Sequence, residues 1–194
     1  QTEPDVTEAT QTAERGHGTK SDGTRLRKEP AHLARTPHEQ AITDFEQALI
    51  CAAEGFYRFA AAIMGPAARD HNLSGQDNVI LQLLMTAGRP RGIADLSRFA
   101  NRDDTANIQY SLRKLIKAEL VEKVPGAAPR ETAYRVTEKG RALTEDLVAR
   151  RREMLMDPTA AMPAFDERLA EATRMLGLVT GLYDHGSRMI AGRD

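Results

Sequence analysis

The chain has 194 residues, a formal net charge of −1 and no tryptophan. This length suits one domain with a tail. Aromatic residues make up only 5% of the sequence, which favours a helical protein packed by alanine and leucine over a β-sandwich. Its apolar runs fall short of the roughly 20 residues that span a bilayer, and no signal-peptide pattern is present. We therefore expect a soluble protein without a membrane segment.

Cys51 is the single cysteine, which excludes an intrachain disulfide and fits a reducing, cytoplasmic setting. A redox-sensing role for Cys51 is one hypothesis, but no basic residue lies close enough in sequence to favour its thiolate, so a small buried or interfacial residue is preferred. The five histidines lack metal-ligand spacing, and no catalytic triad or phosphate loop is present. We expect no enzyme activity, no cofactor and no metal.

Charge is unevenly distributed along the chain. Residues 89–130 contain nine Arg or Lys and five Asp or Glu, a local charge of +4, whereas the remainder carries −5. Positive charge gathered in one segment suits contact with a polyanion such as DNA, although a solvated helix surface would also explain it. Residues 1–35 have almost no large apolar side chains and balanced charges, which predicts a disordered or loosely docked N-terminal arm.

The predicted ordered domain, residues 36–194, opens with a long helix. Thr36, Pro37 and Glu39 form a capping-box pattern with proline at the first helical position, and Gly65-Pro66 ends the helix. The apolar residues at three- and four-residue spacing are Ile42, Phe45, Leu49, Ala52, Phe56, Phe59 and Ile63. Because these exceed what one face requires, we expect the helix to pack against more than one neighbour.

Residues 74–137 are predicted to form a compact lobe of three helices and a hairpin. A second cap, Ser74-Gly-Gln-Asp77, opens a helix that runs to Gly88. A short helix follows, and a turn at 101–103 separates it from a third helix that Asp103 or Asp104 caps. The inward-facing residues of the short helix are predicted to be Ile93, Leu96, Phe99 and Ala100.

The third helix of the lobe has two chemically distinct faces. Its core side holds Ile108, Leu112, Leu115 and Ile116; its outer side holds Thr105, Ala106, Asn107, Gln109, Tyr110, Arg113, Lys114 and Lys117. Asn and Gln can pair with adenine, Arg with guanine or phosphate, and Thr and Tyr with phosphates or a thymine methyl. Such a helix suits the major groove in a helix-turn-helix protein, while a solvated face is the alternative for any single residue.

Two short strands are predicted at Val121–Val124 and Glu131–Val136, joined by a Gly/Pro loop that ends in Arg130. A hairpin in this position is the wing of a winged helix and lies along the DNA backbone, with Arg130 as the expected contact. Thr137-Glu138 opens a long helix expected to end at Asp157-Pro158. A last helix, from about Phe165, directs apolar residues toward a partner: Leu169, Ala172, Leu176, Val179 and Tyr183.

Over about residues 40–186 the chain resembles the MarR family of bacterial transcription regulators. The most specific part is Val136-Thr-Glu-Lys-Gly140, because that family closes its wing with a Leu/Val-Thr-x-x-Gly step into a long helix. Two features depart from the family: Glu119 stands where glycine is usual, and Ala128-Pro-Arg-Glu131 replaces the usual Asp-x-Arg-Arg. The other matching segments are Leu73-Ser74, Ile93-Ala-Asp-Leu96, Ile108…Leu112…Leu115 and Leu120-Val121.

The resemblance implies a mainly α fold with a small β-wing, in which a winged helix-turn-helix lobe (74–137) is flanked by dimerisation helices (36–66 and 138–194). It further implies a homodimer that binds double-stranded DNA at a pseudo-palindromic operator and regulates transcription, with repression favoured and a small-molecule effector as a candidate partner. One alternative is a winged helix used only for protein contacts. Another is the dimerising part of an enzyme such as a methyltransferase, for which we expect no room in this chain.

Overall fold

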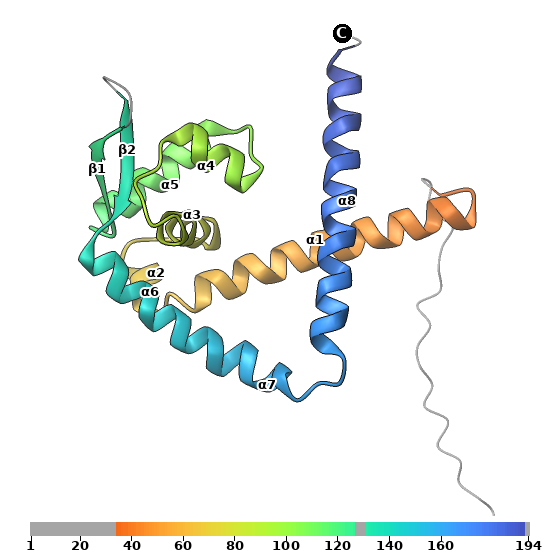
Figure 1. Ribbon diagram of the computed structural model, residues 1–194, viewed down its shortest axis with the longest axis horizontal. Helices are drawn as coiled ribbons and strands as arrows, with labels where there is room; N and C mark the ends of the chain where they lie inside the picture. The colour runs from red at the N-terminus through yellow and green to blue at the C-terminus, as the bar shows by residue number, and fades with distance from the viewer. Residues whose placement is uncertain (1–33, 127–130, 193–194) are drawn as a thin grey trace, which may run out of the picture. The chain divides into compact units, whose positions relative to one another are not determined.

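The computed structural model describes residues 34–126 and 131–192 (Figure 1). The predicted arm up to residue 33 and the predicted wing contact Arg130 lie outside the described residues. The described elements are α1 (Pro37–Ala62), α2 (Pro66–Asp70), α3 (Gly75–Thr86), α4 (Ile93–Ala100), α5 (Thr105–Lys117), β1 (Val121–Pro125), β2 (Thr132–Val136), α6 (Glu138–Arg151), the π-helical turn η1 (Arg152–Met156), α7 (Asp157–Ala160) and α8 (Phe165–Ala191). The predicted mainly α fold with a small β-wing is confirmed.

The chain divides into two compact units, residues 1–47 and 48–194. The first unit contains the start of α1, which has the predicted capping box. The Thr36 amide donates to Glu39 Oε2 at 3.0 Å, and the Glu39 amide donates to Thr36 Oγ1 at 3.2 Å. These two bonds satisfy amides that the first turn of a helix cannot pair internally.

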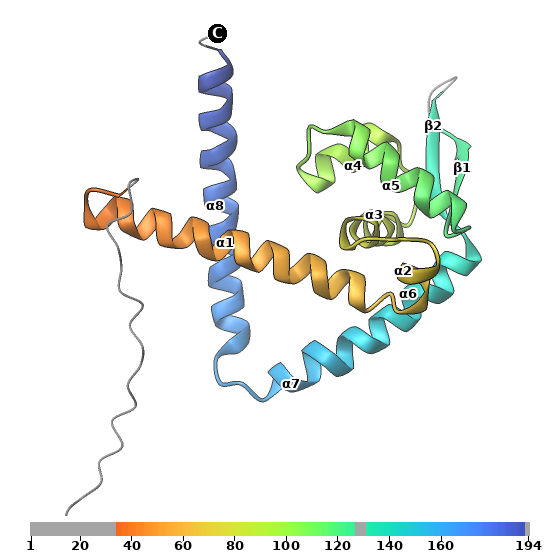
Figure 2. The same ribbon diagram turned by 180° about the vertical axis from the view of Figure 1, so that it is seen from behind.

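The second unit contains the winged helix, whose core lies where α3, α4 and α5 pack against β1 and β2. Figure 2 shows α5 between α4 and the two strands. The strands pair antiparallel, with Val121 opposite Val136 and Pro125 opposite Thr132. The core residues that are at most 2% exposed in these elements are Ile80, Leu81, Leu96, Ile108, Leu112, Leu115 and Val121, and Leu120 directly before β1 is equally buried.

Gly140, the last residue of the most specific sequence motif, lies in the first turn of α6, where this helix contacts the base of the wing. A Cβ atom added at Gly140 would lie 2.2 Å from the Leu120 carbonyl oxygen and 2.7 Å from Val136 Cγ1, so only glycine fits. Thr137 caps α6 by accepting a hydrogen bond from the Gly140 amide at 3.0 Å, and its hydroxyl donates to the Glu119 carbonyl at 2.6 Å. Glu119 has a φ of 62°, the left-handed conformation that glycine adopts most readily, which agrees with the glycine expected at this position from the resemblance to the MarR family.

Three local expectations are wrong. The short helix α2 fills a segment where the sequence predicts only a helix stop. Phe99, predicted to face inward, is 55% exposed. The long helix does not end at Asp157-Pro158 but continues through η1 and α7 to Ala160. In a regular α-helix the ring of Pro158 would clash with the carbonyl of Met154; the wider π-helical turn directly before the proline provides the necessary room.

Candidate DNA-binding surface

α5 presents most of the predicted contact residues to solvent. Its buried side is formed by Ile108, Leu112 and Leu115, each at most 1% exposed. Six of the seven predicted contact residues on this helix are exposed: Thr105, Asn107, Gln109, Tyr110, Arg113 and Lys117. The helix is therefore anchored by one face and offers hydrogen-bond donors, acceptors and positive charge on the other.

The beginning of α5 is fixed by Asp104. Its carboxylate accepts a hydrogen bond from the Asn107 amide at 3.1 Å and another from the Asn107 side chain. Of the two predicted caps, Asp104 is therefore the one observed. The Asn107 side chain is held beside the helix N-terminus, so pairing with a base requires an exchange of this bond for one to adenine.

Arg113 lies on the part of α5 that faces the hairpin. Its guanidinium is 5.7 Å from the centroid of the Tyr110 ring, within the range of a cation–π contact. Arg113 and Gln109 also line a shallow hollow together with Lys123 of β1 and Tyr134 of β2. Groups that can read bases and a basic residue of the wing thus face the same space.

Lys114 differs from the other predicted contacts. Its side chain is only 16% exposed, and its ammonium lies 2.5 Å from the carboxylate of Asp77, which is 2% exposed. The expectation that Lys114 lies on the outer face is therefore wrong. Asp77 was recognisable in the sequence as a helix cap, but no sequence pattern pairs it with a lysine 37 positions later.

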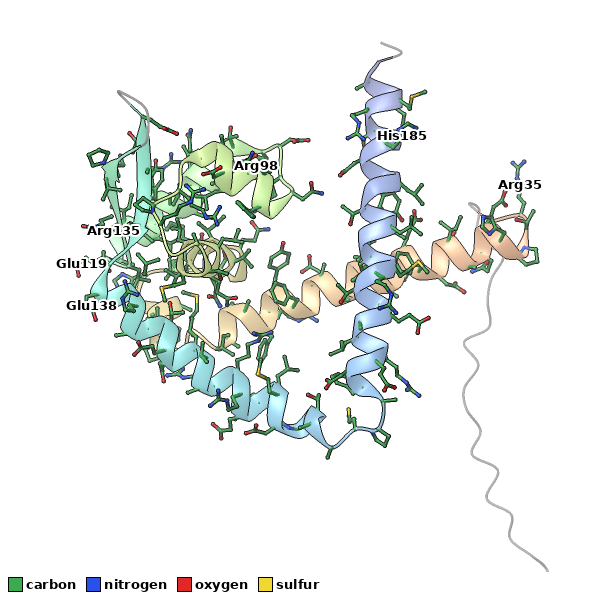
Figure 3. All side chains as sticks on the ribbon, in the orientation of Figure 1. Arg35, Arg98, Glu119, Arg135, Glu138 and His185 are labelled. Carbon is green, nitrogen blue, oxygen red and sulfur yellow. The ribbon has the colours of Figure 1, made fainter. Side chains whose placement is uncertain are left out.

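Arg91 contacts both the wing and α4, which the sequence did not indicate. Its backbone exchanges two hydrogen bonds with Tyr134, of 3.0 and 2.9 Å, which adds a one-residue bridge to the edge of β2. Its guanidinium lies 3.9 Å from the centroid of the Phe99 ring. This contact explains how the exposed aromatic ring is partly covered. On the wing, Arg135, which is labelled in Figure 3, pairs across the strands with Glu122 at 2.7 Å.

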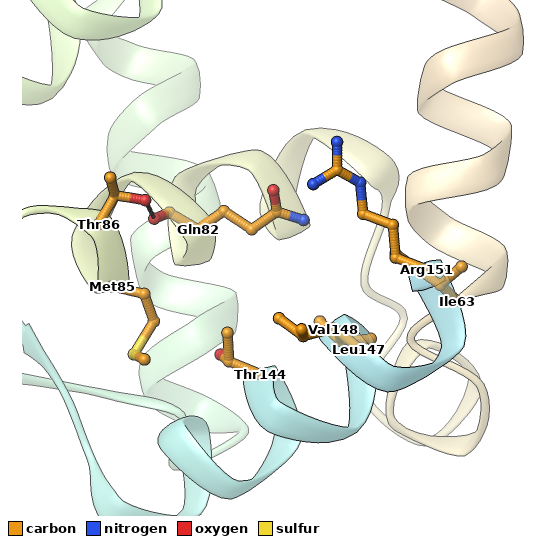
Figure 4. A pocket seen from close by; sticks show the side chains of 8 residues that line it. All are labelled: Ile63, Gln82, Met85, Thr86, Thr144, Leu147, Val148 and Arg151. Carbon is orange, nitrogen blue, oxygen red and sulfur yellow. Dashed lines mark hydrogen bonds between the residues drawn. The ribbon is translucent and has the colours of Figure 1, made fainter. Parts of the chain in front are cut away.

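A hollow of about 180 Å³ lies where the residue after α1 meets α3 and α6. Figure 4 shows Gln82 and Arg151 extending toward it from α3 and α6, beside the apolar side chains of Met85 and Leu147. The other lining residues are Ile63, Thr86, Thr144 and Val148. An apolar wall with one cationic group suits a small organic anion.

Other chemistry is not indicated in the described ranges. No group of three or more His, Cys, Asp or Glu in residues 34–126 and 131–192 could hold a metal ion. Within the same residues, no helix is both long and apolar enough to cross a membrane. Cys51 is exposed on α1 in the single chain; of the two predicted settings, burial is therefore wrong and an interfacial position stays a prediction.

Residues 73–140 match the family of winged helix DNA-binding domains. The geometry of α3–β2 agrees with this match: the segment has a winged helix fold and is similar to winged helix DNA-binding domains. The matched segment includes every predicted contact residue.

Known structures extend the similarity beyond this lobe. The chain is similar to a mutant MarR from E. coli complexed with operator DNA (15% identity, 72% of this chain and 96% of that chain, TM-score 0.58). It is also similar to the transcriptional regulator BldR from Sulfolobus solfataricus (17% identity, 73% of this chain and 98% of that chain, TM-score 0.57). A third similar structure is Staphylococcus aureus MarR in complex with salicylate and kanamycin (15% identity, 75% of this chain and 94% of that chain, TM-score 0.56). These similarities show the fold alone. They confirm the fold that the predicted resemblance to the MarR family implies. A search of curated proteins finds no match.

Proposed function

We propose that this protein is a transcription regulator that binds a pseudo-palindromic operator as a homodimer and acts as a repressor. The observation that carries the proposal is the exposed face of α5, where Gln109, Arg113 and Lys117 stand opposite a fully buried face. Amide and guanidinium groups on a helix of this kind can read base edges in the major groove. A winged helix that only contacts proteins has no need of this combination.

The homodimer is supported by apolar side chains that the single chain leaves uncovered. α8 buries none of its 27 residues. Its large apolar side chains are therefore uncovered: Leu178, Leu182 and Ile190 are each at least 60% exposed. In α1, the helix that precedes the winged-helix lobe, Ile50 and Phe56 are 59% and 52% exposed. Apolar surface of this extent marks a contact with another protein surface, and a second copy supplies a matching one.

The effector is proposed to be a small aromatic carboxylate that binds between Arg151 and the apolar wall of Met85 and Leu147. The similar fold of S. aureus MarR in complex with salicylate makes salicylate a suitable probe. A ligand that prefers one arrangement of α3 and α6 shifts the dimer toward that arrangement and changes its affinity for DNA. Arg151→Gln should weaken salicylate binding in calorimetry, whereas the exposed neighbour variant Arg152→Gln should not. Equal affinities for both variants would remove Arg151 from the site.

Selection from a pool of random-sequence duplexes tests the DNA-binding proposal. Repeated capture by the full-length protein should enrich an inverted repeat whose half-sites lie about one helical turn apart, roughly 10 base pairs. A single unrepeated half-site would contradict the homodimer. Failure to enrich any sequence would contradict sequence-specific binding and favour a protein-interaction module.

A further inference from the structure

The first turn of α3 is a junction that contacts both α1 and α5. Gly75 lies so close to α1 that an added Cβ atom would be 2.1 Å from the Tyr57 carbonyl oxygen. The Asn78 side chain donates to the Ala60 carbonyl at 2.6 Å. Asp77, between these two residues, faces α5 and pairs with Lys114. The same turn is therefore fixed to α1 on one side and to α5 on the other.

Three hydrogen-bond donors converge on one oxygen of the Asp77 carboxylate, Oδ2. It accepts from the Ser74 amide at 2.6 Å, from the Ser74 hydroxyl at 2.9 Å and from the Lys114 ammonium at 2.5 Å. Its residue is 1% exposed. A buried carboxylate is costly unless it keeps its partners, so the ammonium of Lys114 is held at one point. This pair adds a polar contact between α3 and α5 to the apolar contacts that anchor the buried face of α5.

We propose that Lys114 is a positioning residue for DNA recognition: its buried pair with Asp77 orients α5 relative to α3, and its ammonium does not bind a phosphate. The inference rests on the proposed function, since it concerns how the reading helix is held. Lys117, three positions further on the same helix, is exposed and provides the contrast.

The two roles differ in their salt dependence. A lysine bound to phosphate releases a counterion, so its removal weakens specific and non-specific binding alike and lowers the salt slope by about 0.9. Loss of a positioning residue leaves the slope and non-specific binding unchanged and lowers only specific affinity, by about 5- to 100-fold for a disrupted contact network. Removal of the acidic partner Asp77 distinguishes the two roles a second time. If Lys114 bound a phosphate, loss of the negative charge of Asp77 should tighten DNA binding, whereas the positioning role predicts weaker specific binding.

The experiment uses the full chain, the duplex enriched by selection and a scrambled duplex of the same length and composition. Binding is titrated over a range of salt for Lys114→Gln, Asp77→Asn and the double variant, with Lys117→Gln and Glu122→Gln as single-charge controls. Thermal unfolding of each variant identifies the temperature range in which it is folded. The amide replacements keep hydrogen-bonding groups at both buried positions, and Lys114→Arg, which keeps the charge, provides a rescue variant.

We expect Lys114→Gln and Asp77→Asn each to lose specific affinity with an unchanged salt slope, and the double variant to lose no more than either one. Lys117→Gln should show the slope change. A lowered slope for Lys114→Gln, with equal losses on both duplexes, would overturn the proposal and make Lys114 a phosphate contact. Unchanged binding by Asp77→Asn would overturn it as well. If selection enriches no duplex, the proposed function fails instead, which is a separate result.

Discussion

Arg113 and Lys117 are both exposed on α5, but they are expected to contribute differently. Arg113 presents a planar fork of donors beside Tyr110, which suits bidentate pairing with guanine. Lys117 offers a point charge near the end of the helix. Arg113→Ala should weaken binding to the selected duplex by about 1–3 kcal/mol and relax the base preference at one position. Lys117→Ala should weaken binding to all sequences similarly. If repeated selection with Arg113→Ala returned the wild-type motif, Arg113 would not read a base.

Arg130, outside the described residues, remains the predicted contact of the wing. The strands that lead to its loop are in place, with Pro125 opposite Thr132. Arg130→Ala should lower affinity and reduce the salt slope by about one counterion, with little change in the major-groove preference. An unchanged slope and affinity for Arg130→Ala would mean that recognition depends on the helix alone.

Asp77 should contribute to acid sensitivity. Burial opposes its ionisation, but hydrogen bonds from Lys114, Ser74 and Ser111 outweigh burial and lower the pKa of Asp77 below its ordinary value of 3.8. The unfolded chain therefore binds this proton at a higher pH than the folded chain, and stability falls with acid. The contribution is complete above pH 3.8 and disappears as the pH falls from there through the folded pKa. The unfolding temperatures of wild type and Asp77→Asn should converge only below pH 3.8. A difference between the two unfolding temperatures that stays constant with pH would contradict this role of Asp77.

At the scale of elements, the step from the wing into α6 depends on one close approach. Gly140→Ala would place a methyl group 2.2 Å from the Leu120 carbonyl, which requires α6 and β1 to separate. Overpacking of this kind costs about 1–3 kcal/mol. Denaturant unfolding should report this loss, whereas Ala142→Gly, on the exposed side of α6, should cost less than about 1 kcal/mol. A Gly140→Ala variant of wild-type stability would show that the junction is not tightly packed.

Periodicity predicted those elements whose faces differ in polarity. The α5 core residues Ile108, Leu112 and Leu115 are buried as predicted because an amphipathic helix has one stable orientation. The same reasoning failed for Phe99, since an apolar residue can instead be covered by a cation, here Arg91. The helix α2 was missed because five residues carry too short a pattern.

The remaining differences depend on contacts that are distant in sequence. Helical spacing places Lys114 at the edge of the exposed face of α5. Its pairing with Asp77 depends on the packing of α3 against α5, which the sequence does not reveal. The π-helical turn before Pro158 could not be predicted, because proline usually ends a helix and the alternative widening leaves no local signal. Gly140 was recognisable as a motif, but the approach of the Leu120 carbonyl that requires it appears only in the fold.

For the whole molecule, the dimer should depend on the apolar stripe of α8. Leu176→Glu places a charge within the stripe of Leu169, Leu176 and Tyr183, where a partner would bury it without a counter-charge. Light scattering should show the wild type as a dimer at micromolar concentration and this variant shifted toward monomer. Arg188→Glu, which is exposed and by its spacing lies away from both Leu176 and Leu178 on this helix, is the control and should remain dimeric. A wild-type chain that is monomeric would contradict the proposed assembly.

The most direct test of the central claim is a genome-wide footprint of this protein in its cell of origin. Sequence-specific recognition by α5 should give discrete protected sites in promoter regions, each with two half-sites about one helical turn apart, and weaker protection of these sites with Arg113→Ala. Protection spread evenly along DNA, or no protection while the protein is captured with other proteins, would contradict sequence-specific recognition by α5.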